Sequence, residues 1–349
     1  MFSLFKFKLP RFIPFLRVFI GLLLALFAIV YFQQNVDYAG VWQALLLADL
    51  WFVAGAVLCM LLTVVGKAVR WQVLMGGRQA QSKDGEEPGQ AVRLSYIMEV
   101  LLVGIMLNTL FPLRAGDVTR AYLMGSSGRG RSFTMGTVVL EKVLDLIMLS
   151  LTFFLLLLQV SLPAWVSRQG YSVAVSASVI FMGVLVLAFS RQMKWQELIP
   201  RAFMRYAQGN PFLSQIFSRW LAIFNNALSS LDVLRQREDL LRLAAWSLFI
   251  WAISFLTNLF VIWALQLEVP LVAALLVLVV LQLGLSLTSV PGNIGIFEYL
   301  CVLSLSVFAI DGISALTFGI LLHVIVLIPS LIGLFCFVFL RGNARIEGR

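Results

Sequence analysis

The sequence predicts an all-α, polytopic membrane protein with six full spans and two re-entrant or broken helical hairpins, or eight or more spans if the hairpins cross the membrane. Composition is the first observation behind this prediction. Of the 349 residues, 61% are hydrophobic and 12% are charged, whereas average globular chains carry about 25% charged residues. The second observation is a set of apolar segments of membrane-spanning length. The third is that two such segments are interrupted by proline, glycine and charge, one in each half of the chain, which predicts an inverted repeat.

Six apolar segments are long enough to cross a bilayer as a helix, which takes about 20 residues. They lie at 13–32, 50–72, 133–158, 171–190, 243–265 and 313–340. The first follows a basic start and is not followed by a small-residue cleavage site, so we interpret it as an uncleaved span. The two interrupted segments lie at 94–111 and 271–310.

We expect a single integral membrane domain over residues 1–345, with pseudo-repeat halves at about 1–160 and 171–340. The polar stretch 191–242 has apolar residues at helical spacing but no core of its own. It is therefore expected to be a cytoplasmic amphipathic connector, which either lies on the membrane surface or packs on the bundle. Residues 346–349 match a processing-protease site used in fusion proteins and are expected to be a cloning remnant.

The distribution of lysine and arginine orients the chain. Residues 1–17 hold four basic groups and 67–93 hold five, whereas 18–66 and 243–340 hold none. By the positive-inside rule both termini are cytoplasmic, and we expect a multi-pass protein of the cytoplasmic (inner) membrane. The net charge of +9 then belongs to the cytoplasmic face and does not indicate a nucleic-acid partner.

The stretch LNTLFPLRAGDVTRAYLMGSSGRGRS determines how the first interrupted segment is interpreted. If 94–111 crossed the membrane, four basic residues would lie outside: Arg114, Arg120, Arg129 and Arg131. A hairpin that enters from the cytoplasm and returns keeps all four inside. Irregular backbone at membrane depth is tolerated where it is buried in protein or lines a wet cavity. We therefore expect a re-entrant hairpin, with an ordinary span and an exceptional loop as the alternative.

A second interruption, VPGNIGIFE, lies in the half of the chain that lacks basic residues. It contains a proline, a glycine and an acid, namely Pro291, Gly295 and Glu298. The first interruption has the same order of residue types in Pro112, Gly116 and Asp117. Proline and glycine release backbone groups from helix bonding, and an acid at membrane depth costs about 2.5–3.5 kcal/mol on insertion scales. Paired interruptions in corresponding halves indicate the binding site of a transporter.

Three charged residues lie inside the predicted span 133–158. Glu141 and Asp145 are four residues apart on one helical face, and Lys142 lies beside them. Such charges face a bundle interior or a wet cavity and pair with opposite charge; the candidate partners are Lys142 itself, Arg114 and Arg120. A structural ion-pair cluster and a direct role in handling substrate or protons both remain open.

Three further polar residues in apolar surroundings have alternative interpretations. Lys67 and Arg70, near the inner end of a span, either bind a lipid phosphate or anchor their helix at the interface. His323 is the single histidine and has no acid or cysteine near it in sequence. We expect it to be a packed, neutral residue and not a proton relay.

Four motifs in order along the chain carry a family resemblance: GKAVRW from Gly66, NTLFPLRAGDVTRAY from Asn108, VVLEKVLDL around Glu141, and VPGNIGIFE. Together they resemble the flippase-like family named for the transmembrane region of lysylphosphatidylglycerol synthase. Lys142 stands where many members have arginine, and Asp117 where many have glutamate. The resemblance implies a membrane protein that moves or presents lipids such as aminoacylated phospholipids, hopanoids or polyprenyl glycolipids.

We expect the chain to be a lipid translocase with a charged central cavity and not an enzyme. The resemblance associates an aminoacyl-transferring domain with the bifunctional members, and this chain ends after its last span. No cofactor or metal is expected, because no metal-ligand spacing or phosphate-loop motif occurs. The residues expected to bind the headgroup or line the cavity are Lys67, Arg70, Asn108, Pro112, Arg114, Gly116, Asp117, Arg120, Glu141, Lys142, Asp145, Pro291, Gly295 and Glu298.

Two alternatives come from other functional classes. An intramembrane transferase acting on a lipid-linked substrate would use the Glu141 and Asp145 carboxyl groups for acid–base chemistry. A non-catalytic membrane partner of a lipid-modifying enzyme would need no chemistry of its own. Membrane lipids are the expected partners in every case, with a lipid-modifying enzyme or further copies of the chain as possible additional ones.

Overall fold

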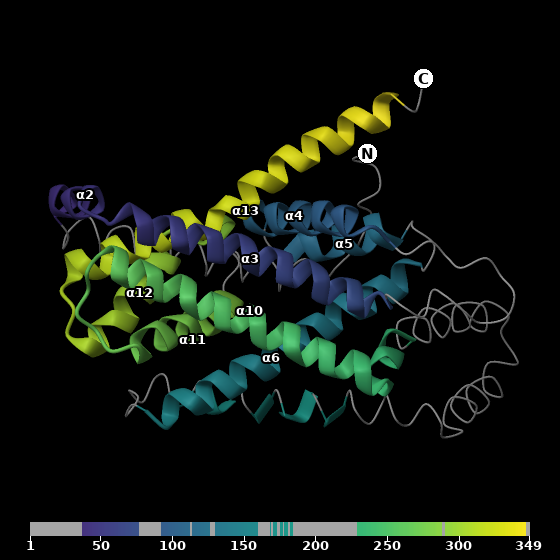
Figure 1. Ribbon diagram of the computed structural model, residues 1–349, viewed down its shortest axis with the longest axis horizontal. Helices are drawn as coiled ribbons and strands as arrows, with labels where there is room; N and C mark the ends of the chain where they lie inside the picture. The colour runs from purple at the N-terminus through teal and green to yellow at the C-terminus, as the bar shows by residue number, and fades with distance from the viewer. Residues whose placement is uncertain are drawn as a thin grey trace, which may run out of the picture.

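The chain is helical throughout the part that the structure, a computed structural model, describes (Figure 1). That part comprises residues 37–76, 92–111, 114–125, 130–159, 229–287 and 290–346, with scattered positions between 168 and 183. Several predicted parts lie outside the described residues: the expected first span 13–32, most of 171–190, residues 191–228 of the connector, Pro112 and residues 347–349. Long apolar helices identify a polytopic membrane protein.

The first half of the described chain contains two long helices separated by two shorter ones. The chain starts with α2 (Tyr38–Leu46) and continues through α3 (Leu50–Leu74), α4 (Leu94–Leu110), α5 (Ala115–Gly125) and α6 (Arg131–Leu157). Aspartates cap the first two helices, because the side chains of Asp37 and Asp49 each accept a hydrogen bond from a backbone N–H in the first turn.

The second half repeats the order of a long helix, two short helices and a long helix. Its elements are the 3₁₀ helix η4 (Ser229–Arg235), α10 (Arg237–Ala264), α11 (Val272–Leu287), η5 (Pro291–Asn293), α12 (Ile296–Leu305), η6 (Ser306–Phe308) and α13 (Gly312–Ile346). The described end of the predicted connector, 229–242, therefore consists of η4 and the first turns of α10.

Four stretches of the described chain are long and apolar enough to span a membrane. Three of them, in α3, α10 and α13, confirm the helices predicted at 50–72, 243–265 and 313–340. The fourth, Pro291–Phe308, joins η5, α12 and η6, but its only α-helix, α12, has 10 residues and a length of roughly 15 Å. Helix α12 alone is therefore about half as long as a hydrocarbon core roughly 30 Å thick. The predicted helix at 133–158 is α6, which has spanning length and carries the buried charges.

Both predicted interruptions are breaks in the helical backbone. Between α4 and α5 the chain passes through Arg114, whose φ is 53°. Between α11 and α12 three residues have positive φ, namely Gly292 at 67°, Asn293 at 55° and Gly295 at 82°. Glycine adopts this left-handed conformation without the steric cost that a side chain brings. Each break therefore ends one short helix and redirects the chain into another.

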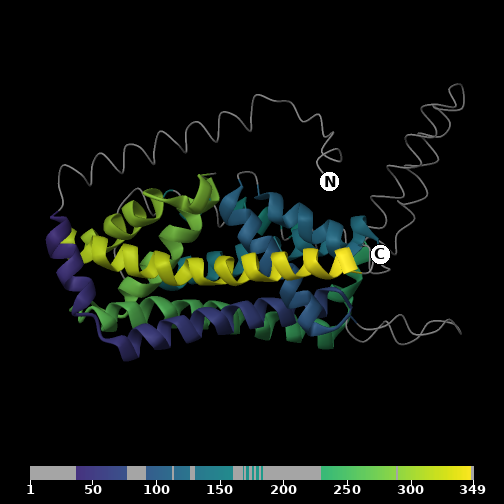
Figure 2. The same cartoon turned by 90° about the horizontal axis from the view of Figure 1, so that it is seen from above.

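Helices α3 and α10 lie side by side and run in opposite directions (Figures 1 and 2). The backbone N–H of Asp49, before α3, donates to the carbonyl of Ala264 at the end of α10. Near the other end of α3, Arg70 contacts Ser247 of α10. The α4–α5 pair occupies one end of the bundle and the α11–α12 pair the other (Figures 1 and 2). Helices α3 and α10 are thus antiparallel, and the two short-helix pairs lie at opposite ends of the bundle.

Large apolar side chains remain exposed along the long helices. They include Leu58 of α3, Leu151, Phe154 and Leu155 of α6, Leu248 of α10, and Val324, Leu331 and Phe335 of α13. Soluble monomers rarely expose contiguous apolar surface on this scale. A lipid environment accounts for these side chains because it removes the cost of leaving them outside the protein core.

We predict that Gly116→Ala destabilises the α4–α5 hairpin. The two helices cross so closely that a Cβ at Gly116 would overlap the carbonyl oxygen of Gly104. Overpacking of this kind costs about 1–3 kcal/mol, so thermal unfolding in detergent should occur at a lower temperature. The matched control is Gly312→Ala, where an added Cβ meets nothing within 4 Å. Equal melting temperatures for the two variants would contradict this packing.

Candidate functional site

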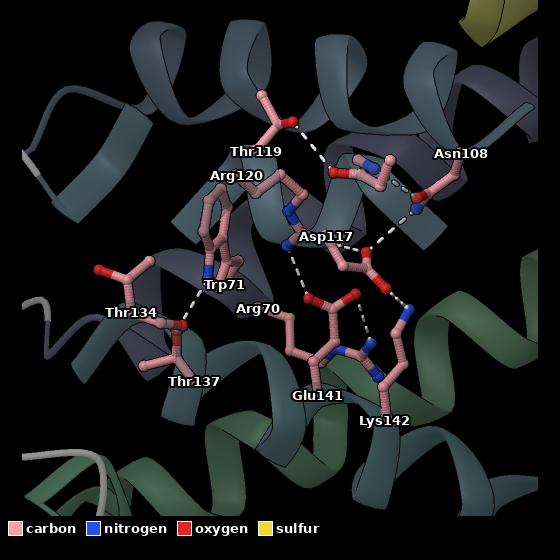
Figure 3. Close-up of polar contacts among 12 residues, drawn as sticks. Arg70, Trp71, Asn108, Asp117, Thr119, Arg120, Thr134, Thr137, Glu141 and Lys142 are labelled. Atoms are coloured by element: carbon pink, nitrogen blue, oxygen red, sulfur yellow. Dashed lines mark hydrogen bonds and ion pairs between the residues drawn. The ribbon is translucent and has the colours of Figure 1, made fainter. Parts of the chain in front are cut away.

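Two short ion pairs form the centre of a charged cluster between α3, α5 and α6. Figure 3 shows one of them, between Arg120 and Glu141. The guanidinium of Arg120 on α5 lies 2.7 Å from the Glu141 carboxylate on α6. The guanidinium of Arg70 on α3 lies 2.7 Å from the Asp145 carboxylate, one turn further along α6. Both arginines and Glu141 are buried. At membrane depth, pairing of this kind is the condition under which such charges are tolerated.

Further contacts hold the two arginines in place. Arg70 also lies 3.8 Å from Glu141 and donates a hydrogen bond to the Ser247 hydroxyl of α10. The Arg120 guanidinium lies 4.1 Å from the centre of the Trp71 ring, in a cation–π contact. The Trp71 indole N–H donates in turn to Thr137 of α6. The cluster thus joins four helices, α3, α5, α6 and α10.

Asp117 connects this cluster to the first break. Its carboxylate lies 3.7 Å from both Arg120 and Lys142, and it accepts a hydrogen bond from the Asn108 side-chain amide. The Asn108 carbonyl oxygen accepts from the backbone N–H of Gly116 at 2.8 Å. Backbone N–H groups in the first turn of a helix have no intrahelical partner. Asn108, near the end of α4, therefore supplies a partner at the start of α5 and ties the break to the ionic cluster.

A cavity of about 670 Å³ lies beside the cluster, where the two breaks meet. From the first break it is lined by Asn108, Thr109, Phe111 and Arg114, and from the second by Gln282, Leu285, Ser286, Val290 and Asn293. Its size is within the range of about 300–1,000 Å³ that holds a small-molecule group. Apolar lining residues, among them Leu146, Leu149 and Trp251, complete it. The cavity therefore combines an ionic wall, an apolar wall and two irregular segments.

Positive charge exceeds negative charge around this cavity. Four basic residues and three acids line it, and Arg70 adds a fifth basic residue directly behind Asp145. Within the described residues neither Lys67 nor Arg114 has a carboxylate within ion-pair distance. Two positive charges are thus left without a carboxylate partner in the part of the chain that the structure describes. An anion is the ligand that such a site favours.

The structure brings eight of the predicted site residues to the cavity wall: Lys67, Asn108, Arg114, Asp117, Arg120, Glu141, Lys142 and Asp145. Arg70 is buried behind them, and Gly116 lies in the α4–α5 contact. Pro291 and Gly295 belong to the second break. Glu298 does not line the cavity and contacts His323 on α13. Pro112 lies outside the described residues.

Sequence reasoning missed several residues of the site. Gln282 and Ser286 line the cavity; they are four residues apart in an otherwise apolar helix, and this spacing was a usable signal. His323 was expected to be a packed, neutral residue, and no acid lies near it in sequence. It is buried, but its Nδ1 lies 2.6 Å from a Glu298 oxygen, 25 residues away in sequence. The turn between α12 and α13 brings these two side chains together, a contact that their separation in sequence did not reveal.

The fold and the site define a class: a polytopic α-helical membrane protein with a predominantly basic ionic cavity between broken helices. The chain belongs to the family described as the lysylphosphatidylglycerol synthase TM region, which matches residues 18–333. This match confirms the family resemblance carried by the four sequence motifs. Among the curated proteins and among the solved structures compared with the chain, none matches.

We predict that Arg120→Gln lowers the free energy of unfolding by about 3–5 kcal/mol, the cost of leaving a buried charge without its partner. Adding Glu141→Gln should restore much of the loss, because the double variant buries neither charge. Unfolding in detergent measures both effects. The control is Arg242→Gln, which breaks partly exposed ion pairs with Glu238 and Asp239 and should cost about 0–1 kcal/mol. A loss at Arg120 no larger than at Arg242 would contradict the network.

Proposed function

We propose that this protein is a lipid translocase, which moves or presents a lipid with a phosphate-bearing headgroup between leaflets. The observation that carries the proposal is the cavity between the two breaks, where Lys67 and Arg114 have no carboxylate partner among the described residues. Phospholipids and polyprenyl-phosphate glycolipids both carry the required anion. The proposal covers the headgroup chemistry and leaves the rest of the lipid open.

The physical task of a translocase explains why such a cavity is useful. A charged headgroup that leaves water for hydrocarbon loses its hydration at a cost of several kcal/mol or more. Basic side chains already held at membrane depth replace part of that hydration by charge-assisted hydrogen bonds. The acyl tails remain in the surrounding lipid, next to the exposed apolar faces of α6 and α13.

Alternate access follows if the two broken segments are hairpins that enter from opposite leaflets. The α4–α5 and α11–α12 pairs occupy opposite ends of the bundle (Figures 1 and 2), and α4 and α11 are short, with 17 and 16 residues. These features support the inverted repeat and the re-entrant interpretation. In this arrangement each break forms one side of the cavity, and movement of one pair opens the cavity to one leaflet. In this proposal both termini lie in the cytoplasm, which the positive-inside rule supports.

An intramembrane transferase is the weaker alternative. A general acid or base must exchange its proton during the reaction. Glu141 and Asp145 each lie 2.7 Å from an arginine, so both carboxylates are already engaged in ion pairs, which favours a structural role. The ion pairs therefore support translocation without covalent change. A lipid-modifying enzyme as a neighbour, and assembly with further copies of the chain, remain compatible with the proposal.

We predict that a cysteine at position 126 is labelled from the cytoplasmic side. The three native cysteines are first replaced by alanine, and Ser126→Cys is then treated with a membrane-impermeant thiol reagent on cells and on inverted vesicles. A re-entrant α4–α5 hairpin places residue 126 inside, so labelling should occur only in inverted vesicles. Labelling on intact cells would show that 94–125 crosses the membrane and would exclude the re-entrant hairpin.

We predict that Lys67→Gln and Arg114→Gln each slow translocation of an anionic phospholipid by about tenfold, because each removes one charge-assisted hydrogen bond worth about 1.5–3 kcal/mol. The assay uses the purified protein in liposomes with a fluorescent phosphatidylglycerol and a quencher confined to one leaflet. Arg242→Gln, a basic residue outside the cavity lining, is the matched control and should leave the rate unchanged.

The same liposomes separate the alternatives. A wild-type protein that transfers lipid without changing it supports the proposal, whereas formation of a new lipid species supports a transferase. A wild-type protein that does neither indicates a non-catalytic partner. Equal rates for the control and both cavity variants would contradict the assignment of the headgroup to Lys67 and Arg114.

A further inference from the structure

Glu298 and His323 form a second polar site that the ionic cavity does not use. The His323 Nδ1 lies 2.6 Å from one Glu298 carboxylate oxygen, and its Nε2 lies 2.8 Å from the carbonyl oxygen of Gly292. The other Glu298 oxygen accepts the backbone N–H of Gly295 at 2.8 Å. The ring of Phe297 stacks on the imidazole. Every polar atom of the pair thus has a partner, and two of these partners are backbone groups of the second break.

Counting protons shows that this arrangement contains one that can be removed. The Gly292 carbonyl is an acceptor, so Nε2 must carry a proton. The carboxylate oxygen and Nδ1 approach to 2.6 Å, which requires one more proton between them. The pair therefore holds one proton more than a neutral imidazole beside a carboxylate. That proton resides on His323 in an ion pair or on Glu298 in a neutral pair, with the same contacts in either case.

Loss of that proton must break one of the contacts. A neutral imidazole has a single N–H. If it stays on Nε2, the Nδ1 lone pair faces the carboxylate at close range, and Glu298 is repelled. If it moves to Nδ1, the Gly292 carbonyl loses its donor and the break is released. In both outcomes the proton leaves to water and no other group changes its covalent state.

The surroundings leave His323 as the only ionic partner of Glu298 within the described residues. The chain has no Lys or Arg from 269 to 340, and its acids there are Glu298 and Asp311. Asp311 caps the start of α13 through the backbone N–H groups of Ile313 and Ser314. The titratable neighbours on α12 are Tyr299 and Cys301.

The other helices packed against the pair bring few ionisable groups. Helix α11 has no charged residue. Asp37 caps α2, and Tyr38 lies in that helix. The basic residues of α3, Lys67 and Arg70, belong to the ionic cluster and cavity. Glu99 of α4 interacts with Cys336, farther along α13. The negative charge of Glu298 is therefore balanced by the proton that it shares with His323, and not by a lysine or arginine of the described residues.

The second break couples this pair to the cavity. Val290 and Asn293, on either side of Gly292, both line the cavity. Gly292, Asn293 and Gly295 all have positive φ, a tight turn whose backbone groups are held by His323 and Glu298. A change in either contact therefore alters the segment that forms one wall of the cavity.

We infer that Glu298 and His323 bind the proton that is coupled to movement of the lipid headgroup, with the break at Gly292 as the linking element. This inference rests on the proposed function. When the proton is bound, His323 holds the Gly292 carbonyl and the second break is closed on the cavity. When the proton is released, one contact is lost and the break is free to move. One proton is taken up from water and returned to water in each cycle.

Glu298→Gln gives a sharp test, because an amide reproduces the proton-loaded contacts. Its carbonyl oxygen accepts the Gly295 N–H, its NH₂ group donates to Nδ1, and Nε2–H still reaches Gly292. The variant should remain folded and locked in the loaded state at every pH. Asp311→Asn is the matched control: it removes the other acid of this region and keeps a side chain that caps helices well.

The single histidine provides a direct readout. Protein labelled with ¹⁵N-histidine and purified through a tag without histidine gives ring nitrogen signals from His323 alone. Over about pH 5 to pH 8 the wild-type protein and Asp311→Asn should pass between two ring states, whereas Glu298→Gln should stay in the Nε2–H form. Lipid translocation should change by about fivefold or more over the same range in the wild type and Asp311→Asn, and by less than about twofold in Glu298→Gln.

The outcomes distinguish this inference from the proposed function. Ring signals that do not change with pH in the wild type, or that change identically in Glu298→Gln, overturn the proton site whatever the lipid assay shows. If the His323 ring titrates but the translocation rate does not depend on pH, only the coupling is overturned. A wild-type protein that moves no lipid refutes the proposed function and the coupling, while the ring titration still decides whether the pair binds a proton. If Glu298→Gln does not fold, the wild-type titration and rate decide.

Discussion

A charge on a membrane helix must find its counter-charge inside the protein, and this constraint organises the first half of the molecule. Glu141 lies in the middle of a long apolar helix, and only a neighbouring helix can supply its partner. Arg120 does so at 2.7 Å, and Arg70 approaches from the other side. Because Arg120 is on the short helix α5 and Arg70 is on α3, one carboxylate fixes three helices relative to one another. The position of α5 in turn places the first break beside the cavity.

The two breaks satisfy their backbone groups in chemically different ways. In the first, the Asn108 side-chain oxygen accepts the Gly116 N–H and its NH₂ group donates to Asp117, so the break is tied to the ionic cluster. In the second, a carboxylate accepts the Gly295 N–H and an imidazole contacts the Gly292 carbonyl. Irregular backbone inside a membrane protein needs such partners because water is scarce there. The first set of partners belongs to the ionic cluster, whereas the second is a separate pair of a carboxylate and an imidazole.

Much of this arrangement was predictable from the sequence, because membranes make composition informative. Apolar length identified α3, α10 and α13, and the charges inside an apolar segment identified the cluster on α6. Proline followed by glycine and an acid located both breaks. Which charges form ion pairs was not predictable. Arg70 and Asp145 are 75 residues apart, and either Arg70 or Arg120 could have been the main partner of Glu141. His323 and Glu298 were interpreted separately for the same reason, since their contact depends on the angle between α12 and α13.

The uneven distribution of charge between the halves gives them different roles around one cavity. The first half contributes every basic residue and every acid that lines it, and the second contributes only polar and apolar groups. In the proposed translocation, a headgroup anion held by Lys67 and Arg114 would therefore be bound mainly by one wall. A wall of charges cannot by itself release that anion, because charges that stay at the same distance and in the same surroundings attract it with the same energy. Release requires a change in distance or hydration, and we propose that the second break, whose Gly292 carbonyl contacts His323, supplies that change.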